Sequence, residues 1–146
     1  MIDLDDNLRR EIMFDNYQEP FHKGLIEDED YHKVNTNSES CIDNLDFIMK
    51  VEDGVIQDIR FDGEACAIST SASSILIRKL IGKSVEDANT ILENYKNMID
   101  EKEYDEDLLG ELNVYDEIYK QPNRKNCALL PEVAIEKLLG ELNNGK

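Results

Sequence analysis

The sequence has few basic residues and no dense cluster of them. It contains 16 Lys and Arg against 33 Asp and Glu, which gives a net charge of −17 at pH 7. Because nucleic acids and anionic membranes attract clustered Lys and Arg, we expect neither kind of partner. The sequence also lacks a run of about 20 apolar residues and shows no secretory signal pattern at its start. The expected location is therefore the cytoplasm.

Cysteine is scarce as well, with only Cys41, Cys66 and Cys127. So small and odd a number does not suit a disulfide-stapled secreted protein, and it favours metal binding or thiol chemistry. The three lack the CxxC pairs typical of zinc fingers, so their spacing alone leaves open both a shared metal site and three buried thiols. A glycine-rich phosphate loop is missing too, which argues against a nucleotide-dependent enzyme.

The 146 residues, of which 40% are hydrophobic, predict a single domain over residues 1–146. Apolar residues at helical spacing predict a helix over residues 3–17, one from Cys66 to a stop at Gly82, and one that Ser84 opens and that runs to Ile99. Alternating residues predict strands over 45–51 and 55–61 around an Asp53-Gly54 turn, with a third strand near 31–35. The expected fold class is α+β, a small antiparallel sheet of about three strands packed against several helices.

The C-terminal third is expected to be helical with one break. Apolar residues predict a short helix within 108–118, and the polar residues 121–126 predict a connection. A last helix is expected over residues 130–142, with Pro131 in its first turn because proline has no N–H to donate.

All three cysteines lie at boundaries between these predicted elements. Cys66 and Cys127 each precede a predicted helix, where free N–H groups and the helix dipole stabilise a thiolate. In an extended backbone, the C-x-D spacing of Cys41 and Asp43 projects both side chains to the same side. These positions are compatible with one shared metal ion, although an isolated acid such as Asp43 is usually a solvated or capping residue.

Three segments of the sequence resemble the U-type iron–sulfur cluster assembly scaffolds, the IscU/SufU-like family. Residues 15–24 (DNYQEPFHKG) are similar to the family's D-H-Y-x-N-P-x-x-x-G segment. Residues 41–43 (CID) fall where the family has C-G-D, and residues 61–69 (FDGEACAIS) are similar to F-x-G-x-G-C-x-I-S. The resemblance covers nearly the whole chain and implies a fold like that of SufE and the N-terminal domain of NifU.

The third cysteine indicates the SufU-like branch of this family. Sixty residues lie between Cys66 and Cys127, and residues 122–127 (PNRKNC) match the branch's P-x-R-x-x-C pattern. The histidine that directly precedes this cysteine in IscU-like scaffolds, and their L-P-P-V-K chaperone motif, are both missing. The resemblance implies that Cys41, Asp43, Cys66 and Cys127 bind Zn²⁺, and that the protein takes persulfide sulfur from a PLP-dependent cysteine desulfurase and serves downstream iron–sulfur assembly proteins.

Some positions depart from the family pattern. Ile42 and Ala65 replace glycines, and Glu19 replaces an asparagine. An isoleucine at a position that needs a positive φ would be strained. Either the backbone near Ile42 differs from that of the family, or the site binds metal less tightly.

Within the resemblance, we predict roles for two residues in catalysis. Cys41 follows a long polar loop, so it is the ligand expected to leave the metal and attack the persulfide. Arg124 is expected to lie near the metal and offset the negative charge of the ligands, although a solvated cation is the ordinary role for such a residue. His22 and His32 are expected at the surface without a metal role.

Three functions therefore remain open from the sequence. The first is a zinc-dependent sulfurtransferase that acts with a cysteine desulfurase. The second is a scaffold that assembles a transient [2Fe–2S] cluster on the same ligands and transfers it to apo-proteins. The third is a nonenzymatic interaction domain that zinc stabilises.

Overall fold

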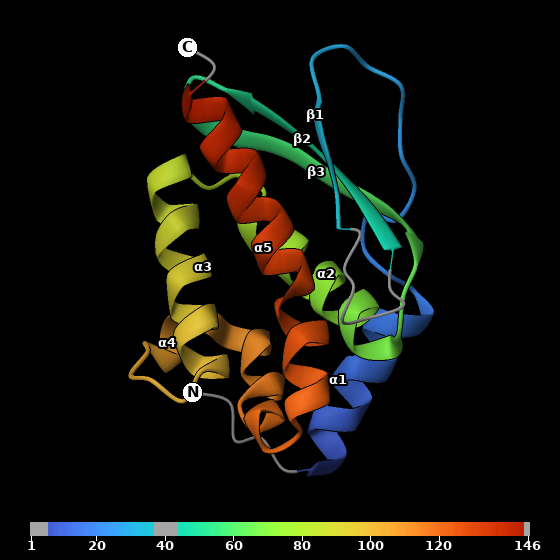
Figure 1. The fold of residues 1–146 in the computed structure, drawn as a ribbon, viewed down its shortest axis with the longest axis vertical. Helices are drawn as coiled ribbons and strands as arrows, with labels where there is room; N and C mark the ends of the chain where they lie inside the picture. The colour runs from blue at the N-terminus through green and yellow to red at the C-terminus, as the bar shows by residue number, and fades with distance from the viewer. Residues whose placement is uncertain (1–5, 37–43, 145–146) are drawn as a thin grey trace.

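The computed structural model describes residues 6–36 and 44–144 of the chain. The elements, in chain order, are α1 (Asp6–Gln18), β1 (His32–Asn35), β2 (Asn44–Glu52), β3 (Val55–Glu64), α2 (Ala67–Leu80), α3 (Val85–Ile99), α4 (Glu106–Leu109), η1 (Gly110–Tyr115), η2 (Ile118–Lys120) and α5 (Pro122–Asn144). Figure 1 shows the helices grouped on one side of the sheet, with α5 running across the front toward the tip of the β2–β3 hairpin. The predicted α+β class is confirmed.

The sheet is antiparallel, with strand order β1-β2-β3. Asp53 and Gly54 form the turn between β2 and β3 with φ values of 53° and 76°. Two successive positive φ values are characteristic of the type I′ turn, whose twist suits a hairpin. The predicted hairpin and the third strand are both confirmed.

The core lies between the sheet and the helices, and α2 is its central helix. α2 contacts α1, α5, β3 and η1. Ser84 caps α3 by accepting a hydrogen bond from the Asp87 N–H, and the apolar stripe of α3 is buried as predicted. The starts of α2 and α3 therefore lie where the sequence indicated.

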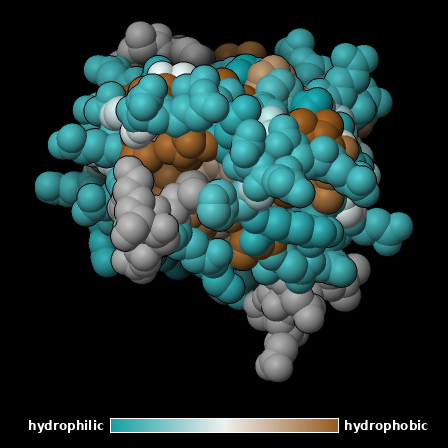
Figure 2. Space-filling view, turned by 90° about the horizontal axis from the view of Figure 1, so that it is seen from above, coloured by the Kyte–Doolittle hydropathy of each residue, from teal (hydrophilic) through white to brown (hydrophobic). Residues whose placement is uncertain are grey.

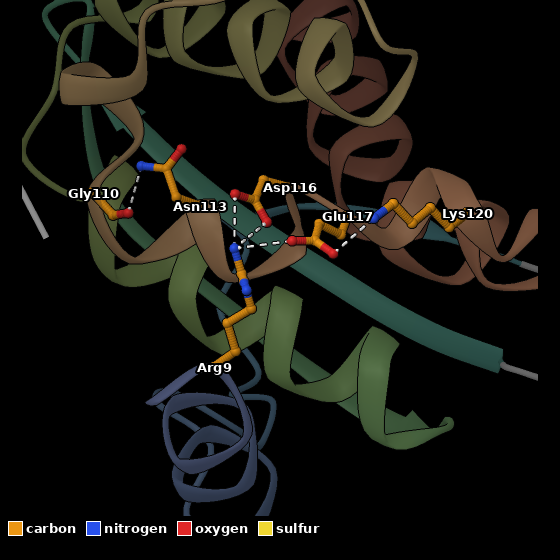
Figure 3. Close-up of polar contacts among 6 residues, drawn as sticks. All are labelled: Arg9, Gly110, Asn113, Asp116, Glu117 and Lys120. Carbon is orange, nitrogen blue, oxygen red and sulfur yellow. Dashed lines mark hydrogen bonds and ion pairs between the residues drawn. The ribbon is translucent and has the colours of Figure 1, made fainter. Parts of the chain in front are cut away.

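The segment after α3 differs from the single short helix predicted there. It forms α4 and two 3₁₀ turns, η1 and η2. Arg9 of α1 holds this segment by pairing with Asp116 and Glu117 at 3.1 and 3.3 Å, and Lys120 pairs with Glu117 at 3.0 Å (Figure 3). Short 3₁₀ turns lack the 3.6-residue period on which helix prediction rests, so their apolar residues imitate a helix in the sequence.

The surface agrees with the acidic composition. Figure 2 shows one face covered mainly by hydrophilic residues, with smaller hydrophobic patches between them. None of the described helices is long and apolar enough to span a membrane.

Candidate metal and thiol site

Cys66 lies at the junction between β3 and α2, as the sequence predicted. It is the N-cap of α2, with φ −66° and ψ 168°, and its Sγ accepts a hydrogen bond from the Ser69 N–H at 3.5 Å. The side chain is half-buried. The free N–H groups of a helix start favour a partner with negative charge, so this position suits a sulfur that binds metal.

Cys127 lies inside α5, and the prediction that it precedes a helix is wrong. α5 begins at Pro122, and the N–H groups of Arg124 and Lys125 both donate to the Gln121 carbonyl. Proline is favoured at the first helical position because that position needs no N–H, so the polar residues after it continue as helix. Cys127 is 7% exposed, and its Sγ lies 3.8 Å from the Asn123 carbonyl one turn earlier.

Pro131 lies in the interior of α5, and the expectation that it occupies the first turn of the last helix is also wrong. A proline in a helix leaves the carbonyl four residues earlier without its usual N–H donor, which here is the carbonyl of Cys127. The Ser69 hydroxyl of α2 donates to that carbonyl at 2.9 Å. The Tyr95 hydroxyl of α3 donates to the next carbonyl, that of Ala128, at 2.7 Å. Ser69 therefore supplies the donor that Pro131 removes, and Tyr95 adds a second contact from α3 to the adjacent carbonyl of α5.

Ser69 contacts both cysteines. It is fully buried, its N–H and its hydroxyl lie 3.5 and 3.6 Å from the Cys66 Sγ, and the same hydroxyl donates to the Cys127 carbonyl. The structure thus brings two cysteines that are far apart in the sequence into contact with one serine, Cys66 through its sulfur and Cys127 through its carbonyl. Cys66 and Cys127 are the two predicted metal ligands within the described part of the chain, and thiols are ligands that suit a soft or borderline ion such as Zn²⁺.

Cys41 and Asp43 lie outside the described residues. Within the described residues alone, no three His, Cys, Asp or Glu side chains gather around a common point as metal ligands would. The flanks of this segment are joined to each other. The Thr36 N–H donates to the Leu45 carbonyl, and the Leu45 N–H donates to the Thr36 hydroxyl, both at 2.9 Å. Asn44 pairs with Glu64, two residues before Cys66.

Gly63 makes the close pairing at this end of the sheet possible. It has φ +129°, and a Cβ at its position would lie 2.2 Å from the Asn44 carbonyl oxygen. Ala65, by contrast, is not among the described residues with a positive φ. The replacement of a family glycine by Ala65 therefore costs no backbone strain, whereas Ile42 lies outside the described residues.

A buried tyrosine lies close to Cys66. Tyr115 shares a hydrogen bond with the Ser71 hydroxyl in the core behind the α2 start. Burial raises the pKa of Tyr115 far above its usual range, and negative charge on Cys66 raises it further. Tyr115 therefore remains a neutral hydroxyl beside the site.

The predicted cationic residue Arg124 is exposed on the first turn of α5, three residues before Cys127. Residues three apart in a helix lie on the same side. No carboxylate of the described residues forms an ion pair with Arg124, whereas Lys125 pairs with Asp100 at 3.6 Å.

The two histidines lie in different settings. His32 is exposed in β1, as predicted. His22 is half-buried, not at the surface, because its Nδ1 lies 2.9 Å from Asp58 and Asp58 also accepts from the Tyr31 hydroxyl at 2.6 Å. His22 thus fastens the segment after α1 to β3.

An apolar groove opens beside Cys66. It has a volume of about 460 Å³, and its apolar walls come from α1 and from the two residues that follow Cys66: Met13, Phe14, Tyr17, Ala67 and Ile68. Phe14 is 56% exposed and Tyr17 is 45% exposed. The half-buried cysteine therefore lies next to an exposed apolar surface.

Comparison with known proteins shows the family of the chain. Residues 8–128 match the family model of the NifU-like N-terminal domain. The chain belongs to this family. It is 31% identical to the zinc-dependent sulfurtransferase SufU of Bacillus subtilis, over 96% of this chain and 95% of that protein. It is 30% identical to the iron–sulfur cluster assembly scaffold protein IscU of Thermotoga maritima, over 71% of this chain and 73% of that one.

A solved structure has a similar fold. The chain superposes with a TM-score of 0.78 on a protein from Fervidobacterium islandicum described as a putative iron–sulfur cluster assembly scaffold for the SUF system. The two are 27% identical, and the match covers 88% of this chain and 94% of the other. The predicted resemblance to the IscU/SufU family of iron–sulfur cluster assembly scaffolds is therefore confirmed.

Sequence reasoning missed the role of Ser69. The small residues 69–74 of α2 are buried, which close packing alone would explain. The signal that could have revealed the serine is Pro131, because a proline four residues after Cys127 leaves the carbonyl of that cysteine in need of another donor. If a helix continues through residue 131, the Cys127 carbonyl needs a donor such as a hydroxyl group from a neighbouring element.

Proposed function

We propose that this chain is a zinc-dependent sulfur acceptor in iron–sulfur cluster assembly, with Zn²⁺ held by Cys41, Asp43, Cys66 and Cys127. The observation that carries the proposal is the meeting of Cys66 and Cys127 at Ser69. The named activity of the Bacillus subtilis relative, which matches over nearly the full length of both chains, supports zinc and sulfur transfer.

Chain connectivity supports the other two ligands. Asp43 directly precedes Asn44 in the sequence, and Cys41 is three residues before it. Asn44 itself pairs with Glu64, which is two residues from Cys66. The proposed ligands therefore all belong to segments that end close to the α2 start.

The proposed reaction is a transfer of one sulfur atom between thiols. The Cys41 thiolate attacks the outer sulfur of a cysteine persulfide on the partner, a PLP-dependent cysteine desulfurase. A new S–S bond forms on Cys41 as the partner's S–S bond breaks, and the partner's cysteine leaves as a thiolate, so the step needs no oxidant or reductant. When bound by Cys41, Zn²⁺ would favour the deprotonated form of the acceptor thiol.

Cys41 is proposed as the acceptor because it follows a long polar stretch of the sequence, whereas the other two cysteines are held by helices. Cys66 is fixed by the cap of α2, and Cys127 is fixed within α5 by its own helix and by Ser69. Asp43, a hard oxygen ligand among sulfurs, would bind less strongly than a fourth thiolate and so ease ligand exchange. Mass mapping after transfer tests this assignment, and a persulfide found solely on Cys127 contradicts it.

The partner is proposed to dock across the groove that Phe14 and Tyr17 line, with Arg124 contributing a cation from the first turn of α5. The groove offers exposed apolar area directly beside Cys66. Arg124 offers a charge that no described carboxylate neutralises. Downstream iron–sulfur assembly proteins are proposed as the recipients of the sulfur.

The test is stimulation of a cysteine desulfurase by the zinc-loaded chain, measured as alanine formed from cysteine. We expect stimulation by the wild type, loss of stimulation with Cys41→Ser, and a large decrease with Arg124→Ala while zinc content stays constant. Lys125→Ala, which removes the neighbouring cation that already pairs with Asp100, serves as the matched control and should retain stimulation. A chain that binds zinc but does not stimulate the desulfurase would be an interaction domain that zinc stabilises.

The second candidate function is a scaffold for a transient [2Fe–2S] cluster on the same residues. The Thermotoga maritima relative and the Fervidobacterium islandicum protein are both described as scaffolds, which favours this alternative. Metal analysis separates the two. A brown protein that contains iron and absorbs visible light supports the scaffold, whereas a colourless protein with one zinc per chain supports the sulfur acceptor.

A further inference from the structure

Because of Pro131, the carbonyl of Cys127 lacks its usual hydrogen-bond donor within α5. An interior carbonyl of a helix ordinarily accepts from the N–H four residues later, but residue 131 has none. The donor comes instead from Ser69, on a different helix, at 2.9 Å. The hydrogen bond that would ordinarily stay within α5 therefore ties α5 to α2, at the residue that carries the thiol.

The same serine contacts the other described thiol. Its N–H and hydroxyl lie 3.5 and 3.6 Å from the Cys66 Sγ, and its side chain is fully buried. Ser73, one turn later, donates to the Ser69 carbonyl at 2.7 Å and so stabilises this turn of α2. One buried hydroxyl thus contacts both described cysteines.

We propose that Ser69 and Pro131 together position Cys127 relative to Cys66 for metal binding. Pro131 prevents α5 from satisfying the Cys127 carbonyl by itself, and Ser69 uses the carbonyl to hold the cysteine at the start of α2. This inference rests on the proposed function, since the metal is the group for which the two thiols are positioned. Neither residue is a ligand, so both act through the cysteines.

Tyr95 provides a matched control within the same helix. Its buried hydroxyl also donates to a carbonyl of α5, that of Ala128, at 2.7 Å. The Ala128 carbonyl, however, has the N–H of Glu132 four residues later, and the hydrogen bond from Tyr95 does not involve a residue that carries a thiol. Tyr95→Phe therefore removes a similar hydrogen bond one residue away without releasing the cysteine pair.

The experiment compares the full-length wild type with Ser69→Ala, Tyr95→Phe, Pro131→Ala and the double variant Ser69→Ala/Pro131→Ala. Zinc affinity is measured by competition with a chromophoric chelator, and the stability of the metal-free protein by thermal unfolding. We expect Ser69→Ala to lower zinc affinity about tenfold or more, as for other residues that orient metal ligands. Tyr95→Phe should lower stability but leave affinity within about twofold of the wild type.

The double variant separates positioning from stability. Pro131→Ala supplies the missing N–H to the Cys127 carbonyl. Ser69→Ala should therefore cost much less stability in the Pro131→Ala background than in the wild type. The zinc affinity of the double variant should stay low, because the tie to α2 remains absent. Affinity that recovers together with stability, or an unchanged affinity in Ser69→Ala, would overturn the inference.

A second readout requires no zinc. In a Cys41→Ser background, a trivalent arsenical that bridges two thiols reports how readily Cys66 and Cys127 reach a common atom, and Ser69→Ala should slow bridging about tenfold. If the wild type binds no zinc, the proposed function fails, and arsenical bridging still decides the inference. Equal bridging rates with and without Ser69, in folded protein, would refute the positioning role on their own.

Discussion

The two described cysteines reach the same place by different means. Cys66 is positioned by local structure, because a strand ends, a helix begins, and the Ser69 N–H of that helix donates to the sulfur. Cys127 is positioned by tertiary structure, because it lies within a helix whose interrupted ladder is completed from α2. A cysteine at a helix start can be found from sequence spacing, whereas one fixed by a partner helix cannot. Substitutions near each cysteine test how far its position depends on local or on tertiary contacts.

The largest expected effect concerns the local structure that positions Cys66. Gly63→Ala would place a Cβ 2.2 Å from the Asn44 carbonyl oxygen at φ +129°, so β2 and β3 would have to separate just before Cys66. We expect a loss of about 3 kcal/mol in the free energy of unfolding, measured with denaturant.

Gly24→Ala is the matched control for that change. Gly24 has φ +120° but no atom within 4 Å of an added Cβ, so only the backbone cost of about 1–2 kcal/mol remains. Equal losses for the two variants would show that the close approach at Gly63 is unimportant.

The next effect concerns α5, the helix that carries Cys127. Glu132 is 1% exposed, and burial together with the neighbouring Glu136 carboxyl group raises its pKa to about 9, against the opposing influence of Lys96. Between its ordinary pKa and about 9, the folded chain retains a proton that the unfolded chain releases. Stability should therefore decrease as the pH rises through this range.

Glu132→Gln removes that titration. At pH 8 we expect the variant to be more stable than the wild type by about 1–3 kcal/mol, and at pH 4 to be nearly equal to it. Denaturant unfolding over this pH range measures the difference, with the exposed Glu103→Gln as control. A variant with the same slope against pH as the wild type would show that Glu132 ionises normally.

A smaller effect concerns Cys66 as the N-cap of α2. In the metal-free protein, Cys66→Ala removes the N-cap acceptor of α2 and should cost about 1 kcal/mol. Cys66→Ser retains an oxygen acceptor at the same place and should be close to neutral, although both variants lose the thiol. If Ser and Ala are equally destabilising by thermal unfolding, the cap contributes little.

The sequence predicted most of the sheet and the first half of the helical layer for local reasons. Asp53-Gly54 determines the hairpin because both residues adopt a positive φ, and Ser84 and Gly82 mark helix ends through capping. These signals depend only on neighbours in the chain, which is why they could be found without a structure.

The region around Cys127 could not be predicted in the same way. Pro131 indicates a helix start by itself, and the Ser69 hydroxyl that replaces its missing donor comes from a helix distant in the sequence. The burial of Ser69 also resembles simple packing until its two partners are known. For Cys41 and Asp43, outside the described residues, the ligand roles remain predictions.

The central claim is that Cys66 and Cys127 share one metal ion with Cys41 and Asp43. X-ray absorption spectroscopy of the zinc-loaded chain tests it most directly. The account predicts three sulfur atoms at about 2.3 Å and one oxygen at about 2.0–2.2 Å from zinc, with one sulfur fewer in Cys66→Ser and in Cys127→Ser. A zinc shell that contains no sulfur, or one whose sulfur count is unchanged in both variants, would contradict it.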